Sequence, residues 1–115
     1  MHELSLSEGI LNAALSAPGV DEARLRALNV KVGALSGTSI SALSFCLELV
    51  LEQKGLKNVK VNILESPARV RCRCGHEYCP PNLWDGCPEC GGFDRQILEG
   101  RDVTLDSVEV EDGED

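Results

Sequence analysis

The stretch that most restricts what this chain can fold into is a cysteine-rich segment at residues 70–93. It holds five of the six cysteines, three of the five prolines and four glycines. Few of its side chains are apolar, so the segment cannot bury enough surface to order itself. A bound metal ion can supply the free energy that such a segment needs in order to fold. The sequence therefore predicts a small protein with a loop that is ordered by a bound metal ion.

A Cys-x-x-Cys pair, followed at once by two glycines, is the strongest ligand motif of the segment. Its thiols are Cys87 and Cys90. Two residues between thiolates let backbone N–H groups turn toward the sulfur atoms, and glycine tolerates the positive φ that this turn requires. The pair predicts one half of a tetrahedral zinc site.

The other half of the site is less regular. Cys72 and Cys74 are the first choice, which gives a set of four thiolates with no open position, as in a structural zinc site. One residue separates these two cysteines, where two are usual. Cys79 and His76 therefore stay open as substitutes.

Disulfides are the alternative explanation for an even number of cysteines. No stretch approaches the roughly 18 apolar residues of a membrane span, and no basic start followed by an apolar run marks a secretory signal. We therefore expect a cytoplasmic protein without a membrane partner, in which thiols stay reduced and bind metal. Cys46 lies near the apolar stripe of a predicted helix and is expected to be a core residue.

The charge distribution argues against nucleic acid as a partner. The formal net charge is −8, and the stretch from Asp102 to Asp115 carries seven acidic residues and no basic one. Phosphate binding needs clustered lysine and arginine, and base stacking needs aromatic side chains, which make up only 3% of the chain. We expect protein partners and no nucleic acid.

The rest of the chain alternates between helical and strand patterns. A strand, a helix and a second strand follow one another through short connections, which predicts that the two strands lie parallel to one another. The stretch Ser36-Gly37-Thr38-Ser39 is expected to supply a loop and the N-cap of the second helix, and a Lys-Gly pair at 54–55 its end. The predicted elements are a helix over 4–16, a strand over 27–35, a helix from about 40 to 53, and a strand over 59–63.

Strand character returns at residues 95–110. The apolar positions change parity between Leu105 and Val108, which predicts a bulge or a register change there. The patterns together predict an α+β fold interrupted by the cysteine segment. We expect residues 1–68 plus 94–110 to form an α/β domain, 69–93 a zinc-binding loop domain, and 111–115 an acidic tail.

The first three residues, Met1, His2 and Glu3, could bind a second metal ion. The α-amine, the His2 amide nitrogen and the imidazole can close fused chelate rings, and Glu3 adds an amide and a carboxylate. Nitrogen donors of this kind suit Ni²⁺ or Cu²⁺ better than Zn²⁺. Because the amide must lose a proton, we expect moderate, releasable affinity, which suits delivery.

The opening MHELSL, the stretch VKVGALSG at residues 30–37 and the inserted cysteine loop make this chain similar to the HypA family. HypA proteins are nickel-insertion accessory proteins of [NiFe]-hydrogenase maturation. The resemblance implies two helices against a three-stranded sheet, with a separate zinc-binding loop. It also implies nickel bound through Met1, His2 and Glu3. The implied partners are the GTPase HypB and the hydrogenase large-subunit precursor, and some relatives also serve urease.

Three hypotheses follow for function. The first is a nickel metallochaperone that is not an enzyme, present as a monomer or weak homodimer. The second is a zinc-ribbon adaptor for protein interactions, in which His2 has no nickel role. The third, a thiol redox enzyme using Cys87 and Cys90, is disfavoured because the pair lies in a Gly/Pro-rich loop and not at the head of a helix.

Overall fold

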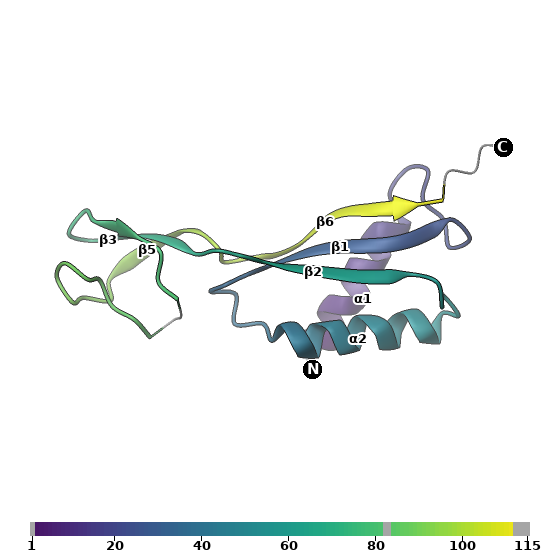
Figure 1. Ribbon diagram of the computed structural model, residues 1–115, viewed down its shortest axis with the longest axis horizontal. Helices are drawn as coiled ribbons and strands as arrows, with labels where there is room; N and C mark the ends of the chain where they lie inside the picture. The colour runs from purple at the N-terminus through teal and green to yellow at the C-terminus, as the bar shows by residue number, and fades with distance from the viewer. Residues whose placement is uncertain (1, 82–83, 112–115) are drawn as a thin grey trace.

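The computed structural model describes residues 2–81 and 84–111 and, for His2, the backbone alone. Within these residues, two helices and two three-stranded sheets are arranged along one long axis (Figure 1). The elements in chain order are α1 (His2–Leu15), β1 (Leu25–Gly33), α2 (Ile40–Gln53), β2 (Lys60–Ser66), β3 (Arg69–Cys72), β4 (Glu77–Tyr78), β5 (Arg95–Glu99) and β6 (Val103–Val110).

The first sheet has the strand order β2-β1-β6. β1 and β2 are parallel, as the strand–helix–strand pattern predicted, and β1 and β6 are antiparallel. Both helices pack against the same face of this sheet, and α2 runs along β2 (Figure 1). The α+β class, with two helices on a three-stranded sheet, is therefore confirmed.

The core lies between the first sheet and the two helices. Leu28, Val30 and Val32 alternate along β1 and point into it, while α2 contributes Leu43 and Leu47. Full burial of each such side chain stabilises the fold by about 1.5–3 kcal/mol. Neither described helix is both long enough and apolar enough to span a bilayer.

Local signals explain where α2 begins and ends. The Oγ of Ser39 accepts a hydrogen bond from the N–H of Ala42 at 3.2 Å, which makes Ser39 the N-cap. The helix stops before Lys54, and Gly55 follows with a φ of 76°. That backbone conformation suits glycine, so the Lys-Gly pair ends the helix as the sequence predicted.

A β-bulge in β6 explains the slip in its apolar pattern. Asn29 of β1 pairs with Ser107, but Val30 pairs with Leu105, so Asp106 is the extra residue. Both Leu105 and Val108 thereby reach the core despite their unequal parity. The predicted bulge is confirmed.

The second sheet has the order β4-β3-β5 and carries the cysteine segment. Since β5 pairs with β3, residues 95–99 lie in the second sheet, whereas the expected boundary counted them with the α/β domain. Alternating apolar residues predict a strand but do not predict which strand it pairs with. The division of the chain into domains stays a prediction.

A second, small hydrophobic core lies where the two sheets meet. Leu35, in the turn after β1, is buried against Ala68 and Val70 of the second sheet's side. The N–H of Leu35 also donates to the carbonyl of Gly100 at 2.8 Å. The molecule is elongated: its radius of gyration is 17.3 Å, against about 13 Å for a compact chain of this length.

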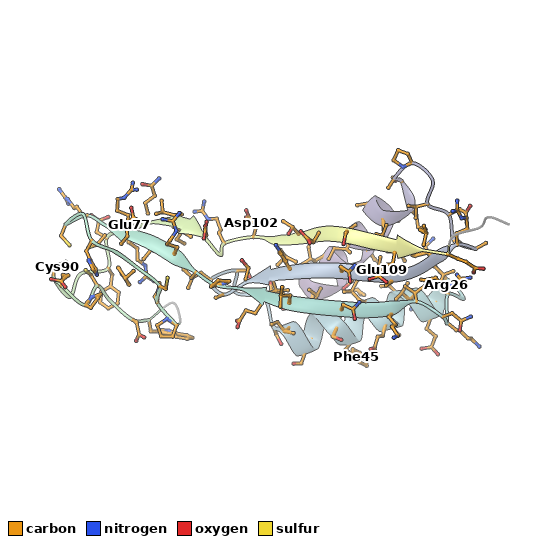
Figure 2. The ribbon with its side chains drawn as sticks, turned by 45° about the horizontal axis from the view of Figure 1, so that its top comes forward. Arg26, Phe45, Glu77, Cys90, Asp102 and Glu109 are labelled. Carbon is orange, nitrogen blue, oxygen red and sulfur yellow. The ribbon has the colours of Figure 1, made fainter. Side chains whose placement is uncertain are left out.

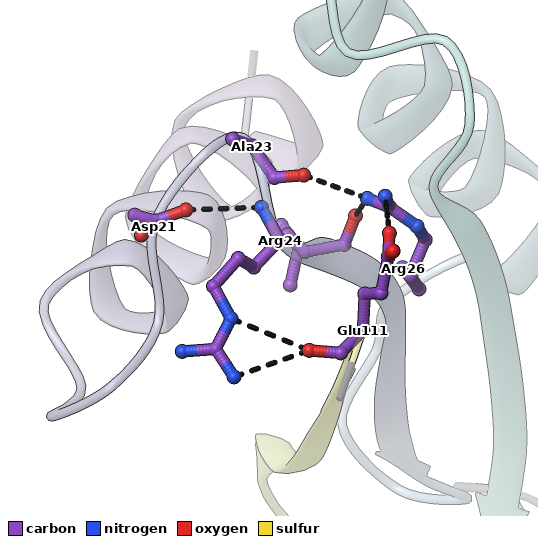
Figure 3. A network of polar contacts seen from close by, with 6 residues as sticks. Asp21, Ala23, Arg24, Arg26 and Glu111 are labelled. Carbon is purple, nitrogen blue, oxygen red and sulfur yellow. Dashed lines mark hydrogen bonds and ion pairs between the residues drawn. The ribbon is translucent and has the colours of Figure 1, made fainter. Parts of the chain in front are cut away.

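A polar network fastens the end of β6 to the start of β1 (Figure 3). The guanidinium of Arg24 donates to the carbonyl of Glu111 at 3.1 and 3.3 Å, and Arg26 forms an ion pair with the carboxylate of Glu111. The N–H of Glu111 donates to the carbonyl of Arg24 at 2.7 Å. The first residue of the expected acidic tail is thus held to the sheet. Residues 112–115 lie outside the described part of the chain.

Candidate metal centre

Four cysteines come together at the far end of the second sheet, and Figure 2 labels Cys90 among them. They are Cys72, at the end of β3, Cys74, in the turn that follows, and Cys87 and Cys90, in the loop before β5. Their four sulfur atoms lie within 4.8 Å of one another. Residues that are up to 18 positions apart in sequence therefore form one group.

Backbone hydrogen bonds shape the loop that holds Cys87 and Cys90. The N–H of Gly91 donates to the carbonyl of Cys87 at 2.7 Å, and the N–H of Cys87 donates to the carbonyl of Gly92 at 2.9 Å. The N–H of Glu89 points at the sulfur of Cys87, at 3.4 Å. Gly91 has a φ of 75°, so this turn uses glycine as the sequence predicted.

The irregular half of the group reaches a similar turn with one residue fewer. The N–H of Gly75 donates to the carbonyl of Cys72, and the N–H of Cys72 donates to the carbonyl of His76, both at 2.8 Å. Gly75 has a φ of 97°. Cys74 thereby faces the other thiols although a single residue separates it from Cys72.

The thiols shift one another's pKa. Burial opposes ionisation of Cys87, but the N–H groups of Cys90 and Glu89 and the neighbouring thiols outweigh it and lower the pKa of Cys87 to about 7. The N–H of Gly92 favours a thiolate at Cys90, yet the neighbouring thiols and burial raise the pKa of Cys90 to about 12. Four thiolates so close together need a compensating cation.

The sulfur positions fit a tetrahedral ion. With metal–sulfur bonds of about 2.3 Å, tetrahedral geometry places neighbouring sulfur atoms about 3.8 Å apart. The Cys72–Cys90 and Cys74–Cys87 sulfur distances are 3.4 and 3.8 Å. A disulfide needs about 2.05 Å, and all six cysteines are free. The group is therefore built for metal binding and not for disulfides.

The remaining candidates for this site lie outside the group. Cys79 is exposed after β4 and is not among the grouped thiols. The ring of His76 stacks on Tyr78, with ring centroids 5.9 Å apart, and His76 is likewise not in the group. Cys46, on α2, is half-buried. The structure thus brings together the first-choice set of four cysteines and neither substitute.

Of the predicted nickel ligands, the structure describes the backbone of His2 and the whole of Glu3, at the start of α1. Met1 and the side chain of His2 are outside the described residues, and α1 begins at His2. Glu3 is half-buried in the first turn, where its carbonyl accepts a hydrogen bond from the Oγ of Ser7 at 2.7 Å. Ser7 is fully buried. This hydrogen bond lies within α1 and links Glu3 to a residue that is buried in the core.

Sequence reasoning did not predict the acidic partners of the arginines beside the cysteines. Arg69 and Arg71 both form ion pairs with Glu77, at 2.8 Å each. Arg73 forms an ion pair with Asp94 at 3.3 Å. The alternating arginines in and just after β3 thus bind the neighbouring segments, and only the fold shows which carboxylates they reach.

Comparison with protein families gives a match over nearly the whole chain. The family described as hydrogenase/urease nickel incorporation, metallochaperone, HypA matches residues 1–110. Hydrogenase maturation factor HypA of Streptomyces avermitilis is 35% identical over 119 residues, which cover 98% of this chain and 89% of that protein. The HypA of Azotobacter vinelandii is 32% identical over 113 residues, which cover 96% of this chain and 100% of that protein.

Two solved structures share the fold. The solution structure of the Ni metallochaperone HypA from Helicobacter pylori gives a TM-score of 0.63 at 19% identity, over 95% of this chain and 97% of that one. A second solution structure of a HypA protein gives a TM-score of 0.57 at 20% identity, over 95% and 92% of the two chains. At these identities the likeness shows the arrangement of the elements.

Proposed function

From the premise that this chain belongs to the HypA family, we propose that it is a nickel metallochaperone. It binds Ni²⁺ at its N-terminus and delivers it during [NiFe]-hydrogenase maturation. The observation that carries the proposal is the family match over residues 1–110, which includes both the opening tripeptide and the four cysteines.

The start of α1 supports the nickel site. The first N–H groups of an α-helix have no partner within the helix. The amide nitrogens of His2 and Glu3 can therefore bind a metal ion without breaking a helical hydrogen bond. Together with the amine of Met1 and the imidazole of His2 they form a nitrogen-rich set that suits Ni²⁺. Nickel is the cargo of this site.

The second metal is a resident zinc ion, held by Cys72, Cys74, Cys87 and Cys90. The closed set of four thiols and the tetrahedral sulfur spacing support a structural role. Bound zinc would neutralise the charge of the thiolates and order the segment around them. The residues of this chain supply the turns and N–H groups that hold the thiolates in place.

We assign no catalytic reaction to the chain. Capture, contact with a partner and release are its tasks, and a lower affinity for nickel in the partner-bound state would drive release. By resemblance, the partners are the GTPase HypB and the hydrogenase large-subunit precursor, and we place this work in the cytoplasm. The division of labour assigns nickel to the α/β part and zinc to the cysteine segment.

Nickel titration of the untagged chain, followed by calorimetry, tests the proposal against the zinc-ribbon adaptor. We expect one nickel ion per wild-type chain and at least tenfold weaker binding by His2→Ala. Zinc content, measured by native mass spectrometry, should be the same in both proteins. Equal nickel affinity in the two proteins would favour the adaptor.

A further inference from the structure

The outer edge of β2 is open. β2 lies at one end of the β2-β1-β6 order, and no described strand pairs with its other side. It pairs with β1 in unbroken register over Lys60–Ser66, whereas the opposite edge strand, β6, carries two register shifts. Bulges and prolines are common protections of a sheet edge. β2 has no bulge, and its nearest proline, Pro67, follows the strand.

The backbone direction shows which groups of β2 are available. The N–H of Ala34, just after β1, donates to the carbonyl of Ser66 at 2.9 Å, so the polar groups of Ser66 face β1. In a parallel ladder, successive residues point their N–H and C=O groups to opposite sides of the strand. Val61, Ile63 and Glu65 therefore direct these groups outward, away from β1.

One side of this edge is the face of the first sheet that the helices do not cover (Figure 1). Leu64 is 63% exposed there. It borders a hollow of about 300 Å³ whose lining includes Asn29, Lys31 and Asn62. A strand added beyond β2 would place alternate side chains beside Asn62 and Leu64 on this face.

On the helix side, a groove separates α2 from the start of β2. Its volume is about 460 Å³, and its lining includes Leu51, Leu56 and Val59. Two carboxylates, Glu48 and Glu52 of α2, also line it, together with one ammonium group, that of Lys57. A strand added at the edge would therefore place its other side chains near a groove in which carboxylates outnumber ammonium groups by two to one.

We propose that the edge of β2 is a docking site for an extended, basic segment of a partner protein, which adds to the first sheet as a fourth strand. Backbone hydrogen bonds to Val61, Ile63 and Glu65 give the affinity, as in other strand additions. Lysine or arginine side chains facing Glu48 and Glu52 give the preference for a basic segment. The proposal goes beyond nickel binding and needs no metal at the N-terminus.

Charge favours such a segment over a second copy of this chain. Each copy carries a formal net charge of −8, so two copies repel one another. If β2 paired with β2 of a second copy, the helix-side positions would offer Val61, Ile63 and Glu65 to the groove, and none of these is basic. A basic partner satisfies both carboxylates of the groove.

Binding of a synthetic peptide tests the proposal. The probe is a capped heptapeptide of alternating lysine and valine, added to the zinc-loaded chain and followed by amide hydrogen exchange in NMR. We expect new protection at the amides of Val61, Ile63 and Glu65. The amides of Asn62 and Leu64 already face β1 and should change little. A matched peptide of glutamate and valine should not bind.

Two pairs of variants separate backbone pairing from simple charge attraction. Glu65→Pro removes one outward N–H and should weaken peptide binding at least tenfold relative to Glu65→Ala, which keeps that N–H. Glu52→Gln should weaken binding more than Glu8→Gln, which removes the same charge from an exposed position on α1. Should Glu65→Pro fail to fold, a fully N-methylated form of the peptide gives the same comparison on the wild-type chain.

Three results would overturn the proposal. One is equal binding by the Glu65→Pro and Glu65→Ala proteins, or by the methylated peptide. Another is new protection along β6 and not along β2. The third is sedimentation showing that the chain alone forms a dimer that Glu65→Pro dissociates, because the edge would then belong to a second copy. None of these results depends on whether His2→Ala binds nickel. The docking proposal can therefore be wrong while the nickel proposal is right, and the reverse.

Discussion

At the scale of single residues, the two groups of donor atoms suit two ions of different character. Four sulfur atoms at tetrahedral spacing suit zinc, while the amine, amide and imidazole nitrogens of Met1, His2 and Glu3 suit nickel. The α-amine is special among these donors, because it can be removed without changing any side chain. It therefore offers the sharpest test of the nickel site.

One added glycine before Met1 should weaken nickel binding at least tenfold, or by about 1.4 kcal/mol or more. The amine would then lie one residue too far away to close the chelate ring with the His2 amide. Calorimetric titration with Ni²⁺ measures the change, and the zinc content serves as the control. Tight nickel binding in the extended chain would contradict the proposed ligands.

The carboxylate of Glu77 should stabilise the second sheet at neutral pH. Hydrogen bonding to Arg71, and charge attraction to Arg71 and Arg69, lower the pKa of Glu77 below its ordinary value. A lowered pKa means that the contribution is complete above about pH 4.3, the value of a free glutamate, and is lost as the pH falls through the lowered value. Glu77→Gln should therefore lower the melting midpoint of the zinc-loaded protein at pH 7.

A thermal scan at pH 7 measures this effect, and Glu89→Gln, which changes an exposed carboxylate, is the control. Because Glu77 is exposed, the decrease should be small. NMR titration should show a higher pKa for Glu77 in Arg71→Ala than in wild type. An unchanged pKa in that variant would mean that Arg71 is not its main partner.

Much of the candidate site could be predicted from residue spacing, and its limits have a physical cause. Cys87 and Cys90 carry a spacing that directly suits a metal turn, so they were predicted without an alternative. Spacing could not choose among Cys72, Cys74, Cys79 and His76, because that choice depends on distances across the sheet. The turn at Gly75 brings Cys74 to the other thiols, and the glycine that follows Cys74 is the one local signal of this turn.

At the scale of elements, two glycines in different surroundings should respond in opposite ways to the same substitution. A Cβ at Gly33, where β1 ends, would lie 2.2 Å from the carbonyl oxygen of Gly100. Because that atom belongs to the backbone, it cannot move aside cheaply. We expect Gly33→Ala to destabilise the fold by about 1–3 kcal/mol or more.

Gly9, inside α1, has no other atom within 4 Å of its would-be Cβ. Gly9→Ala should stabilise the chain by about 0.5–1 kcal/mol, because alanine loses less entropy in a helix. Urea unfolding of both variants with zinc present measures the two changes. A Gly33→Ala protein as stable as wild type would show that the backbones of Gly33 and Gly100 do not lie this close together.

Most elements could be predicted because each carries its own local signal. Ser39 and the Lys-Gly pair mark the ends of α2, and alternation marks β1. The bulge at Asp106 followed from a change of parity within one strand. The assignment of β5 to the second sheet could not be predicted, because alternation shows which residues share a face and not which strand lies beside them.

At the scale of the whole molecule, the two sheets differ in how much apolar surface they bury. The first sheet and its helices share a core that includes eleven buried residues. The buried core beside the second sheet consists of Leu35, Ala68 and Val70, and Leu35 comes from the turn after β1. So small a core cannot offset the entropy of ordering the cysteine segment. We therefore expect the second sheet, and not the first, to depend on a bound metal ion.

Cys87→Ala should remove zinc and unfold the cysteine segment while the α/β part stays folded. Cys87 is the most deeply placed ligand of its loop, and a set of three thiols leaves one tetrahedral position empty. Zinc should fall from one ion per chain to nearly none in native mass spectra. Amide exchange should speed up in β3, β4 and β5 and stay slow in the centre of β1.

Cys46→Ala is the matched control, since it removes a thiol of α2 that lies outside the metal-binding group. It should keep full zinc and slow exchange in both sheets. The decisive comparison is between the two sheets of the Cys87→Ala protein. Loss of protection in both would mean that the contacts of Leu35 couple them into one folding unit. Retained protection in both would mean that the second sheet does not need zinc, and the structural role proposed for the ion would then be wrong.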